Sequence, residues 1–77
     1  MNLSTYQNKI VEQLKEEGNY IWTNEGEGYR VWIGDESGQV KEYLRKDTVR
    51  NLFNLGLIVY SEGDHSKRLF RYTLKNR

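Results

Sequence analysis

The segment Lys46–Leu74 constrains the fold most, because the spacing of its apolar residues changes halfway along. In its first part, apolar or small residues recur at the spacing of one helix face: Val49, Leu52, Phe53 and Gly56. This pattern predicts a helix over Lys46–Leu55, capped by Asp47 or Thr48. Gly56 stands where a left-handed residue commonly ends a helix, so we expect the helix to stop there.

After the glycine the pattern becomes that of two strands. Leu57–Tyr60 is a short apolar run of β-forming residues, and Leu69–Leu74 alternates between apolar and polar side chains. The polar loop between them, Ser61–Arg68, contains the Gly and Asp typical of a hairpin connection. We therefore expect a β-hairpin directly after the helix.

The upstream residues predict a helix and a second hairpin. Apolar residues follow helical spacing over Ser4–Glu17, and Ser4 or Thr5 can cap the first turn. Tyr20–Thr23 and Tyr29–Ile33 are rich in β-forming residues and are separated by a turn with two glycines. Together with the downstream elements, this order indicates an α+β fold.

The segment Gln39–Arg45 has two interpretations. As a strand, it pairs with Tyr29–Ile33 across the turn Gly34–Gly38 and completes a three-stranded meander. As a helix, it has apolar residues at i, i+3 and i+4, which are Val40, Tyr43 and Leu44. The glycine-flanked turn before the segment favours the strand.

The length and composition indicate one small domain, residues 1–77, with a thin core. A chain of this size buries only about 60% of the surface that its unfolded form exposes. The sequence has no cysteine, which excludes disulfides and cysteine-based zinc sites. Because its apolar runs are short and its start lacks an apolar stretch, we expect a cytoplasmic protein without a membrane partner.

The charges are unevenly distributed along the chain. Residues 1–38 carry seven acidic and three basic residues, a net charge of −4, whereas residues 39–77 carry four acidic and nine basic residues, a net charge of +5. A basic half of this kind is suited to phosphate groups or to an acidic protein.

The motif LFNLGLI at residues 52–58, a polar loop, and the motif RLFRYTL at residues 68–74 resemble the recognition helix and wing of winged-helix (winged helix-turn-helix) DNA-binding domains. The resemblance implies a small winged-helix-like α+β domain, ordered helix, short strands, helix and β-hairpin wing. It also implies double-stranded DNA as the partner, with the helix in the major groove and the wing on the backbone. A transcriptional regulator or a phage or mobile-element accessory protein would fit, and the resemblance allows a homodimer.

The candidate DNA-binding residues lie on the polar side of the Lys46–Leu55 helix and on the wing. Arginine can pair bidentately with guanine and asparagine with adenine, while wing cations can contact phosphates. The candidate residues are Arg45, Lys46, Thr48, Arg50, Asn51, Asn54, Lys67, Arg68 and Arg71.

A protein-interaction module or inhibitor without nucleic acid is the alternative function. If Val31 faces the core, Trp32 lies on the other face beside Arg30, and an exposed tryptophan there could anchor a partner. A covered Trp32 would instead be structural. The five strand tyrosines are expected to belong to the core and its rim rather than to a base-stacking surface: Tyr20, Tyr29, Tyr43, Tyr60 and Tyr72.

The sequence offers no catalytic set. His65 is the single histidine and lies in the wing loop, so neither a catalytic triad nor a metal site can be assembled around it. Gly26–Gly28 lacks the lysine of a phosphate-binding loop and contains an acidic residue. We therefore expect no enzyme, no cofactor and no metal.

Overall fold

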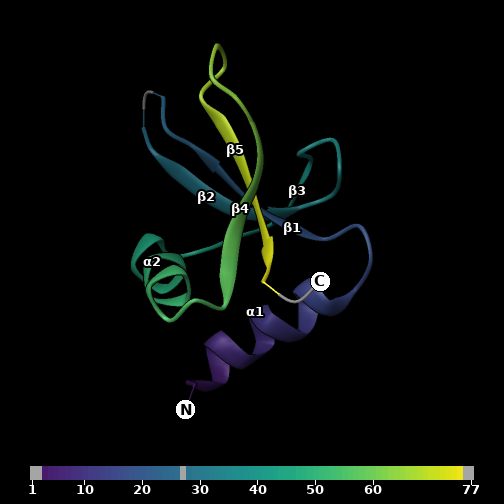
Figure 1. Cartoon of the computed structure of the whole chain (residues 1–77), viewed down its shortest axis with the longest axis vertical. Coiled ribbons are helices and arrows are strands. Elements are labelled where there is room, and N and C mark those ends of the chain that lie inside the picture. The colour runs from purple at the N-terminus through teal and green to yellow at the C-terminus, as the bar shows by residue number, and fades with distance from the viewer. Residues whose placement is uncertain (1–2, 27, 76–77) are drawn as a thin grey trace.

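The computed structural model describes residues 3–26 and 28–75, which form two helices and one five-stranded antiparallel sheet (Figure 1). The elements are α1 (Thr5–Lys15), β1 (Tyr20–Asn24), β2 (Arg30–Gly34), β3 (Val40–Tyr43), α2 (Lys46–Asn54), β4 (Ile58–Asp64) and β5 (Leu69–Leu74). The strand order is β3-β2-β1-β5-β4. The predicted α+β class is confirmed, and the helices lie toward one end of the long axis, with the end of the β4–β5 hairpin at the other.

A capping box begins α1. The Ser4 Oγ accepts a hydrogen bond from the Gln7 backbone N–H at 3.1 Å, and the Gln7 Oε1 accepts one from the Ser4 backbone N–H at 2.9 Å. Ser4 is therefore the cap, as predicted. The helix ends at Lys15, two residues before the predicted Glu17, and Gly18 has a φ of +88° in the turn that follows.

We expect the substitution Ser4→Ala to lower the free energy of unfolding by about 1 kcal/mol, because it removes this cap. Urea unfolding followed by far-UV circular dichroism measures the change. Thr5→Ala is the matched control, since Thr5 is exposed and makes no side-chain cap, and it should change stability by less than about 0.5 kcal/mol. Equal losses in the two variants would contradict the role of Ser4.

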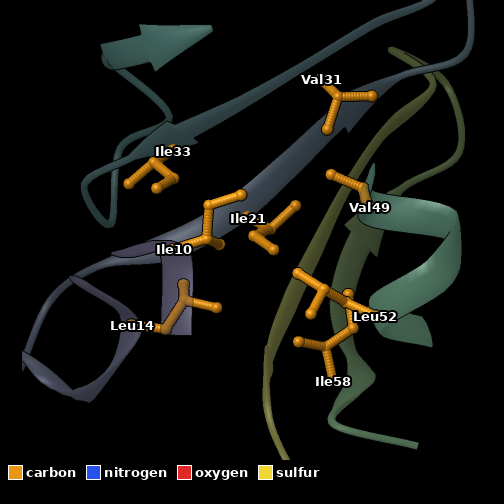
Figure 2. Packing of buried hydrophobic residues seen from close by; sticks show 8 residues of the cluster. All are labelled: Ile10, Leu14, Ile21, Val31, Ile33, Val49, Leu52 and Ile58. Atoms are coloured by element: carbon orange, nitrogen blue, oxygen red, sulfur yellow. The ribbon is translucent and has the colours of Figure 1, made fainter. Parts of the chain in front are cut away.

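The core lies between one face of the sheet and both helices. Figure 2 shows Ile10 and Leu14 of α1 on one side of Ile21, and Val49 and Leu52 of α2 on the other. Alternation along β1 and β2 places Ile21, Val31 and Ile33 on this face, as the pattern at Tyr29–Ile33 predicted for β2. The buried cluster comprises Ile10, Leu14, Ile21, Val31, Ile33, Val49, Leu52 and Ile58.

The segment Gln39–Arg45 contains the strand β3, so the strand interpretation is confirmed. β3 pairs antiparallel with β2. The described elements between α1 and α2 are therefore three strands, and none of them is a helix. Winged-helix domains usually have a helix at this place. The finer expectation of a winged-helix arrangement is therefore not confirmed; what the chain retains is a helix, α2, followed by a hairpin, β4–β5.

The loop between β2 and β3 contacts part of the opposite face of the sheet, at Trp22 and Trp32. The Trp22 Nε1–H donates to the Asp35 carbonyl at 2.8 Å, and the Trp32 Nε1–H donates to the Gly38 carbonyl at 3.0 Å. Hydrogen bonds from the Ser37 hydroxyl and the Gln39 backbone N–H hold the Asp35 carboxylate and lower its pKa. Trp32 lies opposite the core, as alternation predicted, but it is only 7% exposed, so the exposed-tryptophan interpretation is wrong.

Candidate nucleic-acid interface

The helix α2 begins differently from the prediction. Its N-cap residue is Arg45, which makes no side-chain capping bond. The predicted caps are therefore wrong: the Asp47 carboxylate accepts only from the adjacent Thr48 backbone N–H, at 3.0 Å, and Thr48 is buried within the first turn. The C-terminal prediction is confirmed, since Gly56 has a φ of +74° after the helix ends at Asn54.

The exposed side of α2 carries two of the predicted cations and one aromatic ring. Lys46, Arg50 and Phe53 lie at positions i, i+4 and i+7, which places them along one side of the helix. Phe53 was predicted to lie on the buried face, but it is 51% exposed, and its ring contacts the edge of Tyr72 at a centroid distance of 6.0 Å. Asn54 is also exposed, on the part of α2 that faces away from the core.

An open groove of about 500 Å³ runs along this side of α2. We call it the α2 groove. The described residues that line it are Thr23, Glu25, Tyr29, Lys46, Val49, Arg50, Phe53, Ile58 and Tyr72. They come from α2, from β1 and the residue after it, from the residue before β2, from β4 and from β5. The groove therefore combines two cations with three aromatic rings and one carboxylate.

The electrostatics of the α2 groove favour an anionic ligand with hydrogen-bonding groups. The Lys46 Nζ lies 5.2 Å from the centre of the Tyr29 ring, a cation–π distance. Burial, and after it the Glu25 carboxylate, raise the pKa of the hydroxyl groups of Tyr29 and Tyr72. Both hydroxyls therefore keep their protons at neutral pH and can donate hydrogen bonds to a ligand.

Thr23 contributes a polar atom without a partner to the groove. Its side chain is 2% exposed, and its Oγ1 makes no hydrogen bond within the part of the chain that the structure describes. Buried hydroxyl groups are nearly always hydrogen-bonded, because an unpaired one costs free energy.

The predicted wing cations differ in their exposure and in their partners. Lys67 and Arg68 are exposed in the turn between β4 and β5, a hairpin that we call the wing, and Arg68 has a φ of +56°. Arg71 lies on the face opposite the core, where Lys67 lines the same hollow. The guanidinium carbon of Arg71 is 4.2 Å from the centre of the Tyr20 ring, its Nη2 is 2.7 Å from the Glu62 carboxylate, and its side chain is 18% exposed.

The remaining candidates lie apart from one another. The guanidinium of Arg45 lies 5.7 Å from the centre of the Tyr6 ring, toward α1. Asn51 is exposed on α2 but does not line the groove. The structure thus brings Lys46 and Arg50 together, keeps Asn51 and Asn54 on the same helix, and places Arg71 on the other face.

The sequence interpretation missed a row of five rings on the helix side of the wing. Consecutive ring centroids are 6.0 Å apart for Phe53–Tyr72, 5.9 Å for Tyr72–Tyr60, 6.2 Å for Tyr60–Phe70 and 5.3 Å for Phe70–His65. We call these residues the ring row. The tyrosines were expected in the core and rim, but Tyr29, Tyr43 and Tyr60 are exposed. The alternation that places Phe70 and Tyr72 on one face was the signal that could have revealed the row.

Other kinds of site find no support in the described residues. Within residues 3–26 and 28–75, no three His, Asp or Glu side chains are grouped so that they could hold a metal ion. Neither of the helices described is long and apolar enough to cross a membrane. Protein-family models, curated proteins and solved structures were all compared with this chain, and none of them matches it.

Proposed function

We propose that the chain is a small DNA-binding domain that contacts double-stranded DNA with α2 and with the wing. The proposal is supported by four exposed basic residues of α2 and the wing that have no acidic partner in the part of the chain that the structure describes. Lys46, Arg50, Lys67 and Arg68 are all exposed, and none forms an ion pair with a carboxylate of the described residues. By contrast, the three cations that do form ion pairs are Lys9, Lys15 and Arg71. Unpaired cations can neutralise phosphates without first losing a carboxylate partner.

In this proposal, some contacts to DNA would read the base sequence, and others would fix the position of the protein on the duplex. Arg50 and Asn54 project from the part of α2 that faces away from the core, where they could meet base edges in the major groove. Lys46, at the start of α2, and Lys67 and Arg68, at the wing tip, would bind phosphates and set the register. The protein acts in this proposal as a binding module and not as an enzyme.

The test is a fluorescence-anisotropy titration of a labelled generic duplex, carried out at low and then at moderate salt. We expect the double variant Arg50→Glu/Lys67→Glu to weaken binding at least about tenfold at low salt and to reduce the salt dependence, because two phosphate contacts are lost. The matched control is Lys9→Glu/Lys15→Glu, which changes the net charge equally on cations that already have carboxylate partners.

Two results would overturn the proposal. One is the absence of duplex binding by the unmodified chain at low salt. The other is an equal loss in the control variant, which would show that only total charge matters. The alternative, a protein-interaction module, depended on an exposed Trp32. The β2–β3 loop covers this residue, so it cannot anchor a partner.

A further inference from the structure

We propose that the α2 groove and the ring row bind unpaired nucleotides, so that the domain prefers single-stranded DNA, or duplex DNA with an unpaired end, to a blunt duplex. The inference rests on the proposed function, because Lys46 and Arg50 serve both. The inference goes beyond that function because it specifies unpaired DNA as the preferred ligand.

The first argument is the spacing and exposure of the rings. Phe53 and Tyr60 are 51% and 49% exposed, so a base can contact both side chains. Neighbouring rings of the row lie 5.3 to 6.2 Å apart and meet at steep angles. Bases in a duplex are about 3.4 Å apart along each strand and cover one another's faces. Only bases that are unstacked from their neighbours can reach rings with this spacing.

The second argument is the residue that makes room for the row. Gly63 of β4 pairs with Phe70 of β5. A Cβ at this position would lie 2.5 Å from a Phe70 ring carbon and 2.7 Å from the Tyr60 hydroxyl oxygen. No side chain fits there without displacing the two rings. The absence of a side chain at Gly63 is therefore a condition for the row.

The third argument is charge at both ends of the row. Phe53 adjoins Arg50 in the α2 groove, and His65 at the other end lies in the wing turn with the exposed Arg68. Lys67 of the same turn lines the hollow on the opposite face. A nucleic-acid strand that follows the rings would thus meet cations at its start and at its end.

The nearby carboxylates leave most of this path open. The Arg71 guanidinium holds Glu62 on the opposite face, and the Ser66 hydroxyl and backbone N–H hold Asp64 within its own turn. Among the described residues that line the α2 groove, Glu25 is the one carboxylate. It can accept a hydrogen bond from an exocyclic amino group of a base.

The experiment compares three labelled DNAs that share one pyrimidine-rich sequence: the single strand, the blunt duplex, and the duplex with a short single-stranded overhang. Fluorescence anisotropy with the full chain measures each affinity at the same salt concentration. We expect the single strand and the overhang to bind about tenfold more tightly than the blunt duplex.

Two substitutions on the ring row test which residues are responsible. Tyr60→Leu and Phe53→Leu each replace a half-exposed ring, and we expect each to weaken single-strand binding about tenfold and to weaken blunt-duplex binding much less. The matched control is Tyr43→Leu, which replaces an exposed tyrosine on the opposite face and should change neither affinity. Far-UV circular dichroism verifies that all three variants are folded.

The outcomes separate this inference from the proposed function. Equal affinities for single strand and blunt duplex, or a loss in Tyr43→Leu as large as in Tyr60→Leu, would overturn the inference and leave DNA binding intact. If none of the three DNAs binds, both proposals are wrong. A single-strand preference that Tyr60→Leu and Phe53→Leu both abolish would support the inference.

Discussion

The substitution Leu52→Ala should lower the free energy of unfolding by about 2 to 5 kcal/mol, because it opens a cavity in the centre of the core. Leu52 is fully buried and belongs to the cluster that joins α2 to the sheet. A domain of this length has a total stability of roughly 4 to 12 kcal/mol, so the loss is a large share of it. The measurement is urea unfolding followed by far-UV circular dichroism.

Leu55→Ala is the matched control for this prediction. Leu55 is the same residue type, three positions along the chain at the end of α2, but its side chain is exposed. We expect its replacement to cost no more than about 0.5 kcal/mol. If the two variants were equally stable, the packing of α2 on the sheet would not be the main support of the core.

The second large effect is expected for Trp32→Ala, at about 3 to 5 kcal/mol, although Trp32 lies outside the main core. Its ring is buried under the β2–β3 loop, and its Nε1–H donates to the Gly38 carbonyl. It also contacts the edge of Tyr43 on β3, at a centroid distance of 6.4 Å. Truncation to alanine would remove the support of both the loop and the edge strand β3.

Trp32→Phe distinguishes packing from hydrogen bonding at this site. It keeps a ring but loses the bond to Gly38, so we expect a loss of about 1 kcal/mol from that bond and a smaller total effect than for alanine. Urea unfolding of both variants provides the comparison. A stable Trp32→Ala variant would mean that the ring does not support the fold, and would restore Trp32 as a candidate anchor for a protein partner.

Local signals in the sequence predicted most of the elements. The change of apolar period near Gly56 predicted both α2 and the wing, because a left-handed glycine after a helix is a property of a few neighbouring residues. The turn Gly34–Gly38 likewise favoured β3 over a helix. Most boundaries shifted by one or two residues, as at Lys15, where the end of the helix depends on the turn that follows. The end of β4 was predicted less well, because the strand continues to Asp64, four residues past the predicted Tyr60.

Local signals could not predict which side chains lie together on each face of the domain. Arg71 was a candidate phosphate contact of the wing, but the register of β5 against β1 pairs it with Trp22 and places it on the face opposite the core. The cover over Trp32 comes from a loop that folds back across the sheet. Phe53 is half exposed because the residues that α2 buries are Thr48, Val49 and Leu52. These relations depend on contacts between distant segments, which periodicity does not report.

The two edge strands of the sheet have a consequence for self-association. Each edge strand contains a β-bulge, a residue without a partner in the neighbouring strand. The unpaired residue is Lys41 in β3, next to β2, and Ser61 in β4, next to β5. An extra residue of this kind interrupts the row of backbone groups that another strand would need for continuous pairing. Two copies of this domain are therefore poorly suited to join their sheets edge to edge, and a homodimer would have to form through another surface.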